Sequence, residues 1–248
     1  MRKIYTALLF TIIIFAGVIP VFGQTADEYN EMGILFSRMG YYELSIESFD
    51  EAIRLKPNWY VPYFNRGLAH RDNGNTDLAI ADYTSAINYD KTAAIAYLYR
   101  GVAYIEKKYY GRAIQDLSEA IRLNQNYSDA YFHRAYAYRR EGLNAQAIED
   151  YKSALRLKPD FSEGYYNLGN IYNELGDYDN AIVNYTQAIR YNPDDWASYY
   201  NRGNAYSRKG EFSSAVADYN ATLRINPGHN GAMSSKEFAL QYQGSMAP

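Results

Sequence analysis

The ionisable side chains of this chain follow a regular spacing, which limits the chemistry they could do. Four arginines each precede an aspartate by sixteen residues: Arg66 and Asp82, Arg100 and Asp116, Arg134 and Asp150, and Arg202 and Asp218. Two further copies of the pattern have Met32 and Leu168 instead of arginine. These copies also lack the aspartate and carry Ser48 and Asn184. Because an unpaired buried charge is costly, the joint loss predicts structural ion pairs between two helices. A row of arginines that read phosphates or carboxylates is the functional alternative.

Residues that could catalyse a reaction are scattered along the chain. The three histidines, His70, His133 and His229, fall at unrelated places, and no cluster has metal-ligand spacing. No serine has a base nearby in sequence, and there is no glycine-rich phosphate loop. Carboxylate pairs such as Asp194 and Asp195 fall in turns, where they cap helices. We therefore expect no catalytic residue, no metal and no cofactor, and no enzymatic activity.

The composition argues against nucleic acid as a partner. The formal charge of the 248 residues is −3, and removal of Arg2 and Lys3 with the first segment brings it to −5. A nucleic-acid-binding protein is expected to carry a basic stripe instead. The chain has no cysteine, so it has no disulfide, and its 29 tyrosines fall mostly at the periodic places described next.

The elements that position these side chains are set by one fixed sequence period. A glycine or alanine returns six times at the same interval, without an insertion or deletion, at Gly33, Gly67, Gly101, Ala135, Gly169 and Gly203. A tyrosine precedes it by four residues, at Tyr29, Tyr63, Tyr97, Tyr131, Tyr165 and Tyr199. A small, a large and another small residue follow at the same spacing in every copy. A fixed period of this length indicates a stacked array of repeats.

Each repeat is predicted to form two helices. In residues 162–195, apolar residues recur at spacings of three and four on both sides of Gly176, which suits the left-handed residue that ends a helix. Pro193 then ends the second helix, because it lacks an amide donor. One hairpin of this size cannot bury its apolar face, so its stability must come from stacking on its neighbours.

The repeat closely resembles the tetratricopeptide repeat (TPR) family, over residues 26–229. The resemblance implies an all-α fold, a right-handed α-solenoid of antiparallel helix pairs (TPR superhelix), with a C-terminal capping helix. The expected repeats are 26–59, 60–93, 94–127, 128–161, 162–195 and 196–229. A capping helix at 230–243 and a tail at 244–248 follow, and we expect the capping helix to have no other duty. Met233, Phe238, Ala239 and Leu240 are expected to pack on the last repeat.

The resemblance also implies where a partner would bind, because first helices line the concave side in this family. The early and middle repeats offer Phe64, Asn65, Leu68, Leu98, Tyr99, Val102, Phe132, His133 and Tyr136, and the later repeats offer Tyr166, Asn167, Asn170, Tyr200, Asn201 and Asn204. Exposed apolar surface marks interaction sites, and asparagine amides suit an extended peptide backbone. The alternative is that neighbouring repeats cover the apolar residues and that water solvates the amides. Members that grip a terminal carboxylate have basic residues where this chain has Tyr166, Gly231 and Ser235, so that role is not expected.

Residues 1–23 have the layout of a secretory signal peptide. Arg2 and Lys3 precede an uncharged apolar run over 4–22, and cleavage is expected after Gly23. The run is also close to the length that spans a bilayer, so an uncleaved membrane anchor is the alternative. The sequence thus predicts an exported protein, periplasmic or secreted.

Together these features predict a non-enzymatic scaffold that binds a protein or peptide partner in its concave groove, with a role in bacterial envelope assembly. A self-associating structural protein of the envelope is one alternative. A module that binds a glycan or another small ligand is the other.

Overall fold

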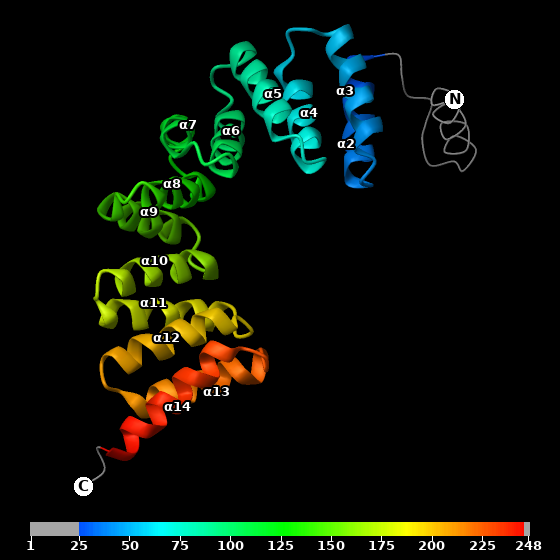
Figure 1. The fold of residues 1–248 in the computed structure, drawn as a ribbon. Coiled ribbons are helices and arrows are strands. Elements are labelled where there is room, and N and C mark those ends of the chain that lie inside the picture. Colours follow the sequence, from blue (N-terminus) through cyan, green and yellow to red (C-terminus); the bar gives the residue numbers. More distant parts are fainter. Residues whose placement is uncertain (1–24, 246–248) are drawn as a thin grey trace. The chain divides into compact units, whose positions relative to one another are not determined.

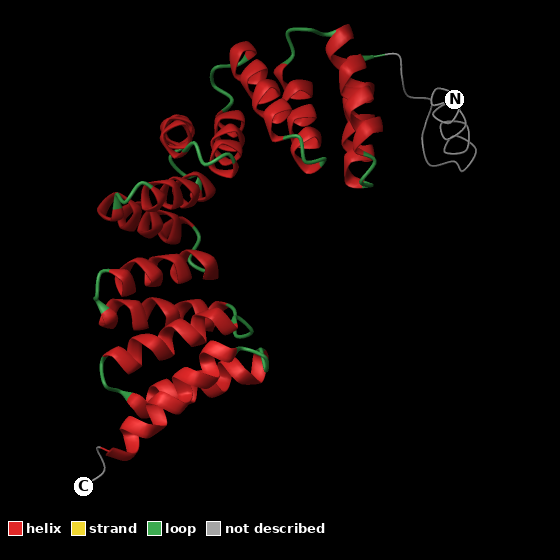
Figure 2. Cartoon of the chain, in the orientation of Figure 1, coloured by secondary structure: helices red, strands yellow, loops and turns green. Residues whose placement is uncertain are grey.

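The computed structural model describes residues 25–245, and in that range the chain forms thirteen helices and no strand (Figure 2). The helices are α2 (Ala26–Arg38), α3 (Tyr42–Leu55), α4 (Tyr60–Asp72), α5 (Thr76–Tyr89), α6 (Ala94–Glu106), α7 (Tyr110–Leu123), α8 (Ser128–Arg140), α9 (Asn144–Leu157), α10 (Ser162–Glu174), α11 (Tyr178–Tyr191), α12 (Trp196–Arg208), α13 (Phe212–Ile225) and α14 (Asn230–Ser245). The prediction of an all-α fold is confirmed. The predicted signal peptide lies outside the described residues.

The helices divide into two compact units at Leu123. The first unit holds α2 to α7, and the second holds α8 to α14 (Figure 1). Within each unit, the two helices of a repeat pack on each other, and the second helix packs on the first helix of the next repeat. Helix α14 packs on α13 in the same way, so it takes the place of a seventh first helix.

Two residues after the first helix of each repeat, the chain has a residue with a positive φ. Glycine occupies this place in five repeats, with φ of 77–82°, and Lys108 occupies it in the third repeat with φ of 62°. The reversal lets the amide three residues beyond the helix bond back to its last turn, as Asp177 N–H does to the Tyr172 carbonyl at 2.9 Å. A side chain at such a φ is strained, so Lys108 is the one costly replacement among these turns.

In four of the six repeats, the core places a large ring against a glycine of the first helix. A Cβ on Gly67 would lie 2.6 Å from the Tyr83 ring, and one on Gly203 would lie 2.9 Å from the Tyr219 ring. Both tyrosine side chains are buried. Any larger residue at these glycines would therefore push the two helices of the repeat apart.

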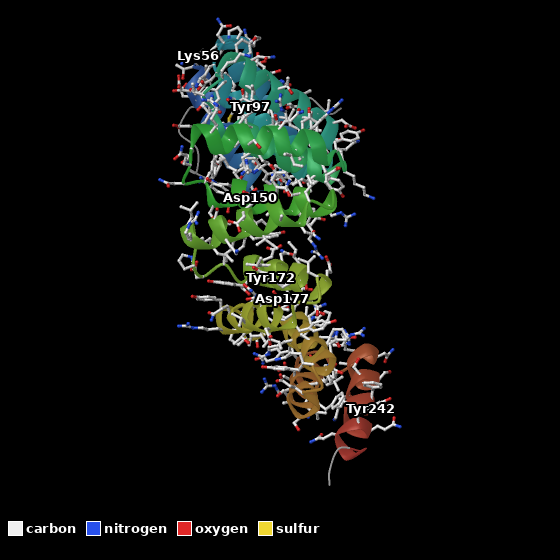
Figure 3. The ribbon with its side chains drawn as sticks, turned by 90° about the vertical axis from the view of Figure 1, so that its left-hand side faces the viewer. Lys56, Tyr97, Asp150, Tyr172, Asp177 and Tyr242 are labelled. Carbon is white, nitrogen blue, oxygen red and sulfur yellow. The ribbon has the colours of Figure 1, made fainter. Side chains whose placement is uncertain are left out.

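The four predicted arginine–aspartate pairs form in the structure. Each arginine donates from Nε and Nη2 to one carboxylate, over N–O distances of 2.6–2.9 Å. The aspartates are only 5–7% exposed; Asp150 is labelled in Figure 3. Burial opposes the charge of Arg100, but the hydrogen bonds that it donates to Asp116 and the negative charge of that carboxylate outweigh burial and raise the pKa of the guanidinium. These arginines are engaged between helices, so they do not form a row of free cations.

Each arginine also lies over the tyrosine three residues before it, with 5.7–5.8 Å from the guanidinium carbon to the ring centre. In addition, Arg100 and Arg202 reach the second helix of the preceding repeat through Nη1: Arg100 donates to Thr84 at 3.0 Å and Arg202 to Thr186 at 2.9 Å. The residue sixteen positions before Leu168 of the fifth repeat is Lys152, whose positive charge would repel an arginine at position 168. Sixteen residues before each of the four arginines the sequence has a possible acceptor, whereas Lys152 precedes Leu168.

Candidate binding site

A large cleft lies in the second unit, and we call it the C-terminal cleft. It has a volume of about 1040 Å³. Its lining residues come from five successive helices: Asn173, Tyr178, Tyr200, Asn204, Ser207, Arg208, Phe212, Tyr219, Ser234, Ser235, Phe238 and Tyr242. The cleft therefore combines aromatic rings, amides, hydroxyl groups and one guanidinium. This is the composition of a surface that orients a polar backbone and packs apolar side chains.

A row of asparagines runs beside and into the cleft. Asn170 Oδ1 accepts hydrogen bonds from Tyr185 at 2.8 Å and from Asn201 Nδ2 at 3.0 Å. Asn204 Oδ1 accepts one from Tyr219 at 2.9 Å, and burial raises the pKa of the Tyr219 hydroxyl. The Nδ2 groups of Asn170 and Asn204 have no hydrogen-bond acceptor among residues 25–245. The hydrogen bonds that their Oδ1 atoms accept fix the orientation of these amide donors.

Helix α14 forms an aromatic wall of the cleft. The Phe212 ring stacks on Tyr242 with centres 5.7 Å apart, and Phe238 lies 4.5 Å from Tyr242, which projects from α14 (Figure 3). Phe238 and Tyr242 are 49% and 44% exposed. Helix α14 therefore lines the cleft in addition to packing on α13, and the expectation that it has no other duty stays a prediction. Only Ala239 of the four expected packing residues is buried; Met233, Phe238 and Leu240 are each more than 40% exposed.

Sequence reasoning missed most of the cleft-lining residues, although the period contains the signal. Phe238 stands one full repeat after Asn204, and Tyr242 stands one full repeat after Arg208. Both aromatic residues thus occupy groove positions of an incomplete seventh repeat. Tyr178 and Phe212 begin second helices, which the resemblance did not assign to the groove.

Three residues of the predicted apolar patch are core residues. Phe64, Leu98 and Phe132 are 8%, 4% and 6% exposed, which contradicts their assignment to an open groove. Phe64 packs between Tyr83 and Tyr99, with ring centres 5.8 and 5.4 Å away. A large side chain at this place covers the buried ring of its own repeat, so its removal would damage folding and not binding alone.

The other predicted residues of the early and middle repeats are half-buried. Leu68 and Tyr99 pack against the core of the first unit, and Asn65 donates to Asn30 at 2.9 Å. His133 lies edge-on to Phe132, and burial lowers the pKa of its imidazole. Val102 and Tyr136 are also half-buried. Tyr166, Asn167 and Tyr200 are half-buried in the second unit.

Two further features, clusters of metal ligands and helices that could span a membrane, are absent from the described residues. Within residues 25–245, no group of three or more His, Asp or Glu side chains could hold a metal ion. No helix in that range is long and apolar enough to cross a membrane.

Comparison with protein families gives matches along the array. A TPR repeat profile matches residues 135–173 and 169–210. Tetratricopeptide repeat profiles match residues 27–58, 64–131 and 196–229. A search of curated proteins gives no match.

Several solved structures have a similar fold. YrrB, a TPR protein with an unusual peptide-binding site, is 23% identical over 77% of this chain and 99% of its own, with a TM-score of 0.68. MamA is 28% identical over 64% and 94%, with a TM-score of 0.61. Pseudomonas aeruginosa pilF is 19% identical over 87% and 97%, with a TM-score of 0.74.

Proposed function

The chain belongs to the tetratricopeptide repeat family, and from this premise we propose that it is a non-enzymatic interaction module whose C-terminal cleft binds an extended polypeptide segment. The observation that carries the proposal is the oriented amide donor of Asn204, which lines the cleft together with the exposed rings of Phe238 and Tyr242. An extended backbone offers carbonyl groups to such donors and side chains to such rings. The peptide-binding site of YrrB, a protein of similar fold, supports this function.

A display selection with a matched pair of variants tests the proposal. Peptides are selected on the full-length protein, and their binding is then measured to Ser207→Trp, which places a large ring in the cleft. Ser37→Trp is the control, because Ser37 holds the same repeat position in the first unit. We expect Ser207→Trp to abolish binding of the selected peptides and Ser37→Trp to leave it unchanged. Equal binding by both variants would place the site elsewhere.

A second candidate function is self-association, favoured by one observation. Met233 and Leu240 are 41% and 46% exposed on α14. Light scattering over a range of concentrations separates the candidates, because self-association raises the apparent mass with concentration. A constant monomer mass would exclude it.

We also propose that the protein is exported, from the layout of residues 1–23 alone. Mass spectrometry of the mature protein tests this. A chain that begins at Gln24 supports cleavage and export, whereas a chain that keeps Met1 in a membrane fraction supports the anchor.

A further inference from the structure

The C-terminal cleft has one charged group, and that group has no partner. Arg208 is the only charged residue of the lining, and no carboxylate lines the cleft. Its guanidinium forms no ion pair or hydrogen bond with any residue between 25 and 245. Arg139, on α8 of the same unit, pairs instead with Glu174. The cleft therefore carries a net positive charge that the fold does not neutralise.

The arginine lies next to one of the oriented amide donors. Asn204 and Arg208 are four residues apart on α12, so both side chains lie on one face of the helix. The Asn204 carbonyl is held by Tyr219, so its amide and the guanidinium both present donors there. A guanidinium fork matches the geometry of a carboxylate.

The same two positions on the next first helix are aromatic. Phe238 and Tyr242 are also four residues apart, and they occupy on α14 the repeat positions that Asn204 and Arg208 occupy on α12. Helices α12 and α14 contact each other. A segment that crosses from one helix to the other thus meets two donors and then two exposed rings.

We propose that the C-terminal cleft selects a segment with an acidic side chain close to a large apolar side chain. The carboxylate pairs with Arg208, and the apolar group packs on Phe238 and Tyr242. This inference rests on the proposed function and adds the chemistry of the segment. It also makes α14 a determinant of specificity.

Matched peptides test the inference by fluorescence anisotropy on the full-length protein. The parent is a short glycine–serine peptide with a central Asp-Phe pair, capped at both ends and labelled with fluorescein. One twin has Asn for Asp, one has Lys for Asp, and one has Ala for Phe. A further twin lacks Asp and has a free terminal carboxylate, which separates a side-chain source of the charge from a terminal one.

We expect the parent to bind about tenfold or more tightly than its Asn and Lys twins, because a hydrogen bond to a charged group is lost. Arg208→Gln should remove this preference. Arg224→Gln should keep it, because Arg224 is an exposed arginine of α13 outside the lining. Phe238→Ala should reduce the preference for Phe over Ala, with unchanged helicity by circular dichroism.

The outcomes separate the two proposals. If all twins bind alike, or if Arg208→Gln keeps the preference, the cleft binds segments without charge selection; this inference then fails while the proposed function stands. If the uncapped twin alone binds tightly, a terminal carboxylate is the ligand, and the inference of an acidic side chain is overturned. If neither these peptides nor any selected peptide binds, both proposals fail.

Discussion

Four tyrosines at one place in the repeat allow the contribution of a single hydroxyl group to be measured within one molecule. The hydroxyl groups of Tyr83 and Tyr151 are buried and have no hydrogen-bond partner among the described residues. Those of Tyr185 and Tyr219 donate to asparagine carbonyls at 2.8 and 2.9 Å. The cause is the residue opposite, which is asparagine only in the last two repeats. Phenylalanine at each position should therefore have opposite effects in the two pairs.

The magnitudes follow from the environment of each hydroxyl group. Loss of a bonded hydroxyl costs about 0.5–1.5 kcal/mol, so Tyr185→Phe and Tyr219→Phe should destabilise by that amount. A buried hydroxyl without a partner costs about 1–3 kcal/mol, part of which is regained when it is removed. Because a small void remains, we expect Tyr83→Phe and Tyr151→Phe to stabilise by about 0.5–1 kcal/mol.

Urea unfolding followed by circular dichroism measures the sign of each change. Since the stability of an array is a sum over repeats and their interfaces, amide exchange in the altered repeat gives the local effect. Leu68→Asn supplies Tyr83 with the partner that Asn170 supplies to Tyr185. In that background, Tyr83→Phe should change from stabilising to destabilising. If Tyr83→Phe and Tyr219→Phe destabilise equally in the unaltered chain, the hydroxyl of Tyr83 has a partner and the reasoning is refuted.

Three further substitutions test the fold. Lys108→Gly should stabilise the chain by about 1 kcal/mol in urea unfolding, because it removes a side chain from a positive φ; a loss of stability would contradict this. Asp116→Ala should cost about 3 kcal/mol or more, and more than replacement of both Arg100 and Asp116 by leucine, because it leaves a buried charge unpaired; equal losses would argue against the pair. Burial lowers the pKa of His70 and outweighs the attraction of Asp82. Stability present above the ordinary pKa of 6.5 is therefore lost as the pH falls below it, and His70→Tyr should flatten this loss between about pH 7 and pH 5; an unchanged slope would contradict it.

The sequence period predicted the helix pairs and the ion pairs because both are local to one repeat. Arg100 and Asp116 lie on the two helices of a single hairpin, so their spacing alone specifies the contact. The bond from Arg100 to Thr84 joins two repeats, and the pattern within one repeat does not indicate it.

The cleft was harder to predict, because exposure depends on what the next repeat covers. Phe64 has the composition of a groove residue, but Tyr99 of the following repeat packs against it and completes its burial. Helix α14 shows the reverse effect. Phe238 and Tyr242 remain exposed because no described helix packs over that face. The burial of a residue in an array depends on the neighbouring repeats, whereas the sequence pattern describes one repeat at a time.

The central claim is that the C-terminal cleft is where this protein binds an extended segment. Hydrogen–deuterium exchange of the full-length protein, with and without a peptide from the display selection, tests it most directly. We predict that the bound peptide slows exchange in α10, α12 and α14 and leaves α2 to α7 unchanged. Protection confined to the first unit, or tight binding without protection of α12 and α14, would contradict the claim.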